Sequence, residues 1–267
     1  TVLIGGYVQH GHVEDALRCF DEMTLKGVIP NSTTFVCILK ACGSIGNAMR
    51  GQQICAEIEI QGLQQQRFVG SAMVDMLAKC RLFTLAQQVF ERIQYQDVVA
   101  WTSLISGYAQ LGNADIVVTL FDSMIREEVK PSLVTFTVVL NACSHGGLLD
   151  KGPYYFDIMS NEYGFVPTLE HHTCMIDLFG RVGHFDKAMA LIEKMHSLDY
   201  PVWCALLGAC EKWGNVNLGR LAFEKAIKLG NANAAGAYTC MANIYAAAGL
   251  EEDAKNIEAM RLKLSSY

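Results

Sequence analysis

Apolar residues along the chain fall into pairs of helical runs that single glycines separate. Before a glycine they recur at a spacing of three or four residues, as in Leu104, Ile105 and Tyr108. A second run follows the glycine, such as the one that carries Phe20 and Met23. No segment of useful length alternates with the period of two that a strand requires. The pattern therefore predicts pairs of amphipathic helices joined by short turns.

The glycines between these runs recur at a nearly constant period. They are Gly11, Gly46, Gly112, Gly147, Gly183, Gly214 and Gly249, and Arg81 occupies an eighth position of the same series. The successive intervals are 35, 35, 31, 35, 36, 31 and 35 residues. Glycine suits a helix end that must enter the left-handed region. Eight similar units therefore tile nearly the whole chain.

A small residue lies five positions beyond the glycine in all but one unit, in which the position is Val117. The small residues are Ala16, Gly51, Ala86, Gly152, Ala188, Gly219 and Ala254. A small side chain allows two helices to cross closely. Several units end at a proline, where a helix must stop: Pro30, Pro131 and Pro167. Because one hairpin cannot bury both of its apolar faces, we expect an all-α protein in which stacked helical hairpins form an α-solenoid.

The composition narrows the function classes. Apolar residues make up 51% of the chain and charged residues 18%, which fits segments that each have a buried side. The net charge of −6 argues against a nucleic-acid binder held by a basic surface. The ten cysteines include no C-x-x-C pair, so we interpret them as reduced, buried apolar residues. No apolar run predicts a membrane span, and we expect a piece of a longer protein, because the chain opens inside a unit.

Several segments carry a family resemblance. They are IGGYVQHG (4–11), FVGSAMVDMLAKC (68–80), DVVAWTSLISGYAQLGN (97–113) and LVTFTVVLNACSHGGLLDKG (133–152). These resemble pentatricopeptide repeats of the plant PLS type, in which P, L and shorter S units alternate, whereas tetratricopeptide repeats keep a fixed length. PVWCALLGACEKWGNVNLG (201–219) and YTCMANIYAAAGLEEDA (238–254) resemble the two E motifs that follow such repeats.

The resemblance implies a right-handed solenoid and a division of the chain into eight units. Residues 1–31 are a partial P unit, 32–66 an L unit, 67–97 an S unit, 98–132 a P unit, 133–168 an L unit, 169–199 an S unit, 200–233 the first E motif and 234–267 the second. It also implies binding of single-stranded RNA in plant mitochondria or plastids, with mitochondria slightly favoured. Proteins with E motifs typically select one cytidine for C-to-U editing, so we expect this chain to recognise the site and to recruit the deaminase in trans.

In this family the fifth and the last residue of a unit choose the base, one unit per nucleotide. We call these two residues the base-reading pair. The resemblance assigns Thr1/Asn31 to adenine, Ser71/Asp97 to guanine, Thr102/Ser132 to a purine and Thr173/Asp199 to guanine, although the unit that ends at Asp199 is one residue short. The L units carry Val36/Gln66 and Thr137/Thr168, and Val36 has no polar atom with which to discriminate bases. The expected target, 5′ to 3′, is A-n-G-R-n-G.

Two further groups of residues are expected to support the RNA. The second residue of a unit packs on base faces, and these residues are Thr33, Phe68, Val99, Val134 and Glu170. Phe68 can stack on a base, whereas Glu170 is poor for this role. Lys79 and Arg181 lie where phosphates would pass, and the alternative is that each is a solvated surface charge.

Purely structural roles compete with some of these assignments. Taken singly, Ser71 and Thr102 are better explained as helix N-caps, and only the register repeated down the chain favours base recognition. Trp101, Trp203 and Phe136 are expected in the core and not as base platforms.

The sequence offers no catalytic constellation. It has no H-x-E followed by C-x-x-C, so the zinc deaminase signature is missing and we expect neither an enzyme nor a cofactor. His171, His172 and Cys174 lie close together, but adjacent residues project about 100° apart on a helix and no fourth ligand is evident, so we expect no metal site. The expected partners are single-stranded RNA and, through the E motifs, a DYW-type deaminase or other editing-complex proteins, with no membrane. The alternatives are a structural subunit of an organellar ribonucleoprotein such as the ribosome, and a protein-interaction scaffold.

Overall fold

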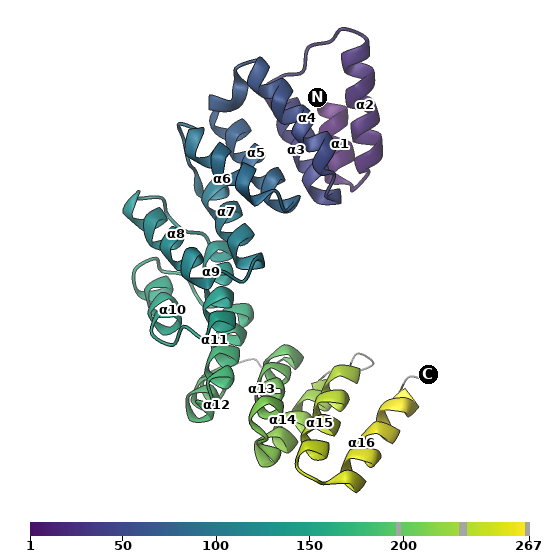
Figure 1. Ribbon diagram of the computed structural model, residues 1–267, viewed down its shortest axis with the longest axis vertical. Helices are drawn as coiled ribbons and strands as arrows, with labels where there is room; N and C mark the ends of the chain where they lie inside the picture. The colour runs from purple at the N-terminus through teal and green to yellow at the C-terminus, as the bar shows by residue number, and fades with distance from the viewer. Residues whose placement is uncertain (196–198, 230–233, 265–267) are drawn as a thin grey trace. The chain divides into compact units, whose positions relative to one another are not determined.

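The computed structural model describes residues 1–195, 199–229 and 234–264, and all of its secondary structure over these residues is helical. Contacts divide the chain into two compact units, Thr1–Val138 and Val139–Tyr267. Helix α9 (Leu133–Gly146) runs from the first unit into the second. Figure 1 shows the first unit in purple to teal and the second in green to yellow.

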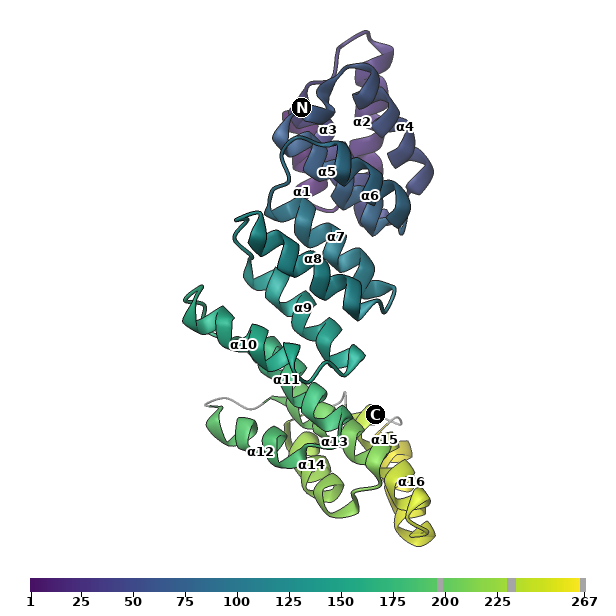
Figure 2. The same ribbon diagram turned by 60° about the vertical axis from the view of Figure 1, so that its left-hand side comes forward.

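The first unit is a stack of helical hairpins. Its elements before α9 are α1 (Val2–Gln9), α2 (Val13–Leu25), α3 (Ser32–Ile45), α4 (Ala48–Ile60), the 3-10 helix η1 (Leu63–Gln65), α5 (Arg67–Lys79), α6 (Phe83–Arg92), α7 (Val98–Gln110) and α8 (Ala114–Arg126). The first helices of successive hairpins pack on one another, α1 on α3, α3 on α5 and α5 on α7. The second helix of each hairpin packs on its own first helix (Figure 2).

The second unit repeats this arrangement. It contains α10 (Lys151–Asn161), α11 (Leu169–Arg181), α12 (Phe185–Lys194), α13 (Tyr200–Trp213), α14 (Val216–Leu229), α15 (Ala235–Ala247) and α16 (Glu251–Leu264). Here α11 packs on α13 and α13 on α15. Stacked helical hairpins, the predicted fold, are therefore confirmed in each unit.

The turn inside each hairpin uses the left-handed backbone that the glycine period predicts. All seven glycines of that series have φ between 66° and 82°. Arg81, which takes the glycine position in the third predicted unit, has φ 60°. A non-glycine residue is strained in this region because its Cβ approaches the backbone. Arg81 therefore adopts the same turn conformation as the glycines, and its backbone is strained there.

The small residues after each turn lie where two helices cross closely. A Cβ added to Gly51 would lie 2.3 Å from Sδ of Met76, and one added to Gly152 would lie 2.4 Å from Cδ2 of Leu178. A Cβ at either position would fit only if the Met76 or Leu178 side chain moved. Val117, the exception to the small-residue pattern, is also fully buried.

Aromatic pairs join successive hairpins in the first unit. Phe20 of α2 meets Phe35 of α3 edge to face at 6.1 Å between ring centroids, and Phe121 of α8 meets Phe136 of α9 at 5.4 Å. Trp101, Trp203 and Phe136 are at most 4% exposed, so their predicted place in the core is confirmed. Over the described residues, none of the helices is long and apolar enough to cross a bilayer.

Candidate nucleic-acid interface

In several predicted units the last residue is also the N-cap of the next unit's first helix. Asn31 caps α3, Asp97 caps α7 and Thr168 caps α11. The side chain of Asn31 accepts a hydrogen bond from the backbone N–H of Thr34, and that of Asp97 accepts from Val99 and Ala100. Because a cap oxygen must face the first turn of the helix, the cap fixes the orientation of the whole side chain. The second polar atom of the amide or carboxylate is then held at a defined position.

The first base-reading pair, Thr1 and Asn31, is joined through a third residue. Oγ1 of Thr1 lies 2.7 Å from Oγ1 of Thr34, and Thr34 donates to Oδ1 of Asn31 over 2.9 Å. The direct distance from Thr1 Oγ1 to Asn31 Oδ1 is 3.5 Å. Thr1 and Asn31 are exposed, whereas Thr34 is fully buried. Among the described residues, no hydrogen bond uses Nδ2 of Asn31, which leaves both of its donors available to a ligand.

The second pair, Ser71 and Asp97, is in direct contact. The Ser71 hydroxyl lies 2.8 Å from Oδ1 of Asp97 and 2.9 Å from the carbonyl of Arg67. Ser71 is only 2% exposed, and Asp97 is half-buried. Oδ2 of Asp97 takes part in none of the hydrogen bonds within the described part of the chain. In this conformation Asp97 is the outward-facing member of the pair.

The third pair, Thr102 and Ser132, repeats the linkage of the first. Oγ1 of Thr102 lies 2.7 Å from Oγ1 of Thr135, which lies 2.9 Å from Oγ of Ser132. The backbone N–H of Ser132 donates to Oγ1 of Thr135, and the N–H of Thr135 donates to Oγ of Ser132. Thr135, like Thr34, is fully buried.

The fourth pair, Thr173 and Asp199, lies in the second unit and is not joined. The Thr173 hydroxyl donates to the carbonyl of Leu169, one helical turn earlier. Asp199 is the exposed N-cap of α13, and its side chain makes no cap hydrogen bond. The two side chains share no hydrogen bond among the described residues. The geometry that links the other pairs is therefore absent where the predicted unit is one residue short.

A groove of about 690 Å³ lies at the predicted first L unit. Its lining includes the pair Val36 and Gln66, the basic Lys40 and the second-position residues Thr33 and Phe68. Phe68 is 71% exposed, so its side chain is accessible to a planar ligand. The groove thus combines an aromatic surface with a positive charge and has only the Gln66 amide at its base-reading positions.

The other apolar second-position residues are also exposed. Val99 is 48% and Val134 is 63% exposed, although apolar side chains of this size are ordinarily buried. Glu170 is exposed as well. In the closing L unit, the Thr168 hydroxyl lies 2.7 Å from Nδ1 of the buried His171 in a reciprocal cap, and Thr137 donates to the carbonyl of Leu133.

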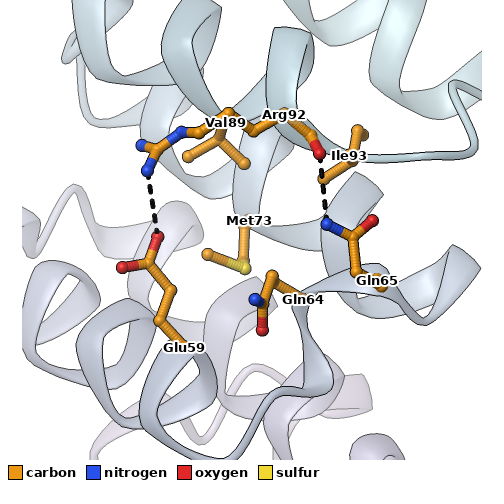
Figure 3. Close-up of a pocket in the computed structure, with 7 residues that line it drawn as sticks. All are labelled: Glu59, Gln64, Gln65, Met73, Val89, Arg92 and Ile93. Carbon is orange, nitrogen blue, oxygen red and sulfur yellow. Dashed lines mark hydrogen bonds and ion pairs between the residues drawn. The ribbon is translucent and has the colours of Figure 1, made fainter.

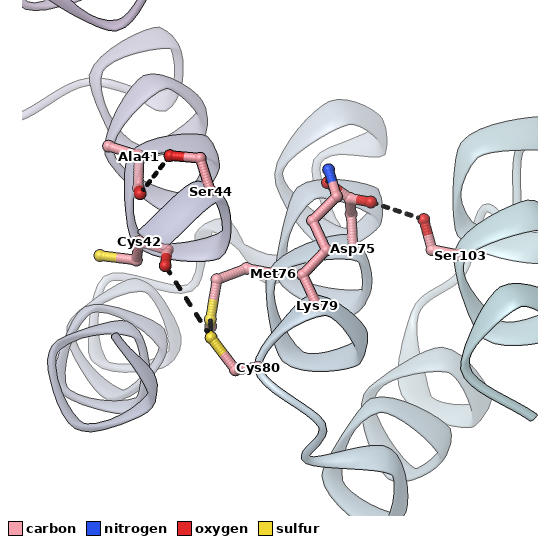
Figure 4. Close-up of polar contacts among 8 residues, drawn as sticks. All are labelled: Ala41, Cys42, Ser44, Asp75, Met76, Lys79, Cys80 and Ser103. Carbon is pink, nitrogen blue, oxygen red and sulfur yellow. Dashed lines mark hydrogen bonds and ion pairs between the residues drawn. The ribbon is translucent and has the colours of Figure 1, made fainter. Parts of the chain in front are cut away.

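The predicted phosphate contacts, Lys79 and Arg181, both have acidic partners four residues earlier. Lys79 Nζ lies 2.6 Å from Oδ2 of Asp75, whose Oδ1 accepts from Ser103 at 2.8 Å (Figure 4). Arg181 Nε lies 2.7 Å from Oδ2 of Asp177. Neither aspartate was expected from the sequence, although the i,i+4 spacing is a signal for such ion pairs. Each cation is about half exposed, and an aspartate of the same helix partly neutralises its charge.

A smaller cavity of about 190 Å³ shows how the chain is held before Asp97 (Figure 3). Gln65, one of its lining residues, donates from Nε2 to the carbonyl of Arg92 over 3.1 Å. Its Oε1 accepts from the backbone N–H of Gln94 over 2.9 Å. The amide of Gln65 therefore fixes the segment that leaves α6 and leads to the cap at Asp97.

The cysteines are mostly buried or half-buried thiols. Burial raises the pKa of Cys55 to about 12 and that of Cys42 to about 11. Figure 4 shows the Cys80 thiol directed at the carbonyl of Cys42 and at the sulfur of Met76. No group of three or more His, Cys, Asp or Glu side chains arranged to hold a metal ion occurs among the described residues.

Two repeat models match the chain. The PPR repeat family matches residues 1–44 and 96–145, and the PPR repeat matches residues 134–162 and 170–200. The chloroplastic pentatricopeptide repeat-containing protein CRR2 of Arabidopsis thaliana is 37% identical over 263 residues, which are 97% of this chain and 40% of that protein. The mitochondrial protein At4g19191 of the same plant is 38% identical over 252 residues, 94% of this chain and 38% of that protein. The chain spans about a third to a half of the length of such relatives.

Solved structures agree in fold. A crystal structure of the pentatricopeptide repeat protein PPR10 in complex with an 18-nt psaJ RNA element matches with a TM-score of 0.84 at 18% identity, over 96% of this chain and 38% of that one. PPR10 from maize in another crystal structure matches with a TM-score of 0.52 at 17% identity, over 97% of this chain and 43% of that one. Because the two repeat models together match more than half of the chain, the chain belongs to the pentatricopeptide repeat family.

Proposed function

We propose that this protein binds single-stranded RNA in a sequence-specific manner in plant mitochondria or plastids. The observation that carries the proposal is the row of base-reading pairs in residues 1–138. Three pairs have their two members joined by hydrogen bonds, either directly or through one buried threonine. A short polar side chain can discriminate bases only when the base edge is unpaired, which single-stranded RNA provides. Named relatives are mitochondrial or chloroplastic, which supports the location.

The expected target is A-n-G-R-n-G, read from the N-terminal end. Asn31 keeps two donors for the acceptor N1 of adenine, whereas Asp97 keeps an acceptor for the N1–H of guanine. The first L unit contributes stacking on Phe68 and little base discrimination. The division into P, L, S and E units underlies this register and is itself part of the proposal.

An electrophoretic gel shift tests this function. The protein is expected to bind an oligonucleotide that contains A-n-G-R-n-G at least about tenfold more tightly than a scrambled sequence, since each lost base contact costs about 0.5–1.5 kcal/mol. Equal binding of the two oligonucleotides would contradict sequence recognition. No RNA binding at all would favour a protein-interaction scaffold.

The net charge of −6 favours a second candidate, a structural subunit of an organellar ribonucleoprotein. Such a subunit would bind RNA with little selectivity and would co-purify with a large particle. The affinity for the target should fall with added salt if cationic side chains neutralise phosphates in the groove. RNA binding with little selectivity between the target and the scrambled sequence would support the second candidate.

We further propose that the RNA-bound protein acts as the site-recognition factor for C-to-U editing. This step rests on the resemblance of α13–α14 and α15–α16 to E motifs, and it assigns to these hairpins the recruitment of a DYW-type deaminase or other editing-complex proteins in trans. The test is an editing assay on RNA that carries the target and a downstream cytidine. Conversion is expected only when both this protein and the deaminase are present, and conversion by the deaminase alone would contradict the role.

A further inference from the structure

The two P-unit base-reading pairs share a contact that the sequence did not indicate. In each, a fully buried threonine from the third position of the next unit bridges the two members: Thr34 joins Thr1 to Asn31, and Thr135 joins Thr102 to Ser132. We propose that Thr34 and Thr135 set which member of each pair donates and which accepts a hydrogen bond, and that they thereby set the base preference of the two P units. The inference rests on the proposed RNA-binding function and deepens it.

In the first pair the amide oxygen of Asn31 can only accept, and this favours one direction of the hydrogen bonds. The backbone N–H of Thr34 donates to the Asn31 side chain, so the atom in that position must be the amide oxygen and not the nitrogen. The single hydroxyl proton of Thr34 also goes to that oxygen, over 2.9 Å. With its proton on that oxygen, Thr34 has only lone pairs left for Thr1, and Thr1 is then the donor across the 2.7 Å contact.

This order of hydrogen bonds determines which donor and acceptor groups the pair presents to a ligand. Once its proton is used, the Thr1 hydroxyl offers lone pairs alone, while Nδ2 of Asn31 offers N–H groups. An acceptor beside a donor complements the Watson–Crick edge of adenine, where N6 donates and N1 accepts. Guanine presents the opposite order, because its O6 accepts and its N1 donates. Thr34 touches neither base, and its role is that of a positioning residue.

In the third pair, Thr102 and Ser132, neither direction of the hydrogen bonds is favoured in this way. Ser132 has a hydroxyl in place of an amide, so Thr135 can donate to Ser132 and accept from Thr102, or donate to Thr102 and accept from Ser132. Both orders satisfy the same two short contacts and both keep the two backbone caps. One order presents the adenine complement and the other the guanine complement. The second P unit is therefore expected to accept both purines.

The two S-unit pairs have no bridging threonine, and they do not need one to set the direction of their hydrogen bonds. The corresponding third-position residues are Ala100 and Val202, which have no polar side-chain atom. Their pairs end in Asp97 and Asp199, and an ionised carboxylate only accepts hydrogen bonds. No direction remains to be set, and Ser71 donates to Asp97 directly.

The test measures the adenine-to-guanine binding ratio at single nucleotides. The 267-residue protein and its Thr34→Val and Thr34→Ser variants are titrated with A-n-G-R-n-G oligonucleotides that differ only at the first, the third or the fourth position. For Thr34→Val, the adenine preference at the first nucleotide is expected to fall from about tenfold to about twofold or less, while the guanine preference at Ser71/Asp97 stays. Thr34→Ser keeps the hydroxyl and should keep the preference. Thr24→Val, on the outer helix α2, is the matched control.

A second variant tests the proposal in the opposite direction. Ser132→Asn gives Thr135 an amide oxygen that can only accept, so the fourth nucleotide should change from either purine to adenine over guanine. Unchanged binding ratios in both Thr34→Val and Ser132→Asn would overturn the proposal that Thr34 and Thr135 set the base preference. A uniform loss of affinity at every nucleotide, with the ratios unchanged, would also overturn it, because the threonines would then be structural. A wild-type protein without any base preference would overturn the proposed sequence-specific RNA binding, and with it the proposed role of the two threonines.

Discussion

The Ser71 hydroxyl lies 2.8 Å from Oδ1 of Asp97, although the two residues are 26 positions apart. One belongs to the first helix of a hairpin, and the other is the N-cap of the next hairpin's first helix. The packing of successive hairpins is thus what brings the two members of a base-reading pair together. A pair that is already held in place loses little conformational freedom when it binds a base.

Replacement of Asn31 by Asp is predicted to change the preference at the first nucleotide from adenine to guanine. The carboxylate can still accept from the N–H and hydroxyl of Thr34, but its second oxygen accepts where Nδ2 of Asn31 donates. Each mismatched hydrogen bond should cost about 0.5–1.5 kcal/mol. Gel shifts with A and G at this position measure the change, and an unchanged preference would show that the register is wrong.

Phe68→Ala is predicted to weaken RNA binding by about 1–3 kcal/mol, the value of one stacked base, without changing which bases are preferred. The ring is 71% exposed, so its removal should leave the stability of the fold unchanged. Leu25→Ala on α2 is a matched control, because Leu25 is 86% exposed. Equal loss of affinity in both variants would argue against stacking at Phe68.

Arg81→Gly is predicted to stabilise the protein by about 1 kcal/mol, because glycine adopts φ 60° without the Cβ strain of an arginine. The reciprocal control is Gly112→Ala at the equivalent turn, where φ is 75° and no atom lies within 4 Å of the added Cβ. That variant should be destabilised by backbone strain alone. Urea unfolding of both variants measures the difference, and the prediction fails if Arg81→Gly lowers the free energy of unfolding.

Stability is predicted to fall as the pH rises above about 9. Burial raises the pKa of Cys55 and of Cys210 from 9.0 to about 12, so these thiols stay protonated in the folded chain while they ionise in the unfolded one. The unfolded state then binds fewer protons, and the free energy of unfolding should decrease by up to about 1.4 kcal/mol per pH unit for each thiol. Below pH 9 the contribution is fully present.

Urea unfolding at pH 8, 9 and 10 measures this dependence. Cys210→Ala should show a shallower decrease than the wild type, because one of the buried thiols is removed. A free energy of unfolding that stays constant from pH 8 to pH 10 would contradict the assignment of buried, neutral thiols.

The sequence by itself determined the hairpins, their turns and the residues at which they cross. These features are local, because the helical period, the left-handed turn and the need for a small side chain at a crossing each act within a few residues of the chain. The turn at Gly11 and the close approach of two helices at Gly51 could thus be predicted from the sequence alone. The core positions of Trp101 and Trp203 follow from the same periodicity.

Only the tertiary structure decided which polar atoms remain available to a ligand. The partners that use up the others come from neighbouring hairpins: Thr34 lies 33 residues from Thr1, and Ser103 lies 28 residues from Asp75. The burial of Ser71 and the pairing of Lys79 with Asp75 likewise depend on how the helices are packed and turned. A hydrogen bond is short and directional, so a spacing in the sequence can bring two side chains near each other, but the packed backbone decides which atom donates to which.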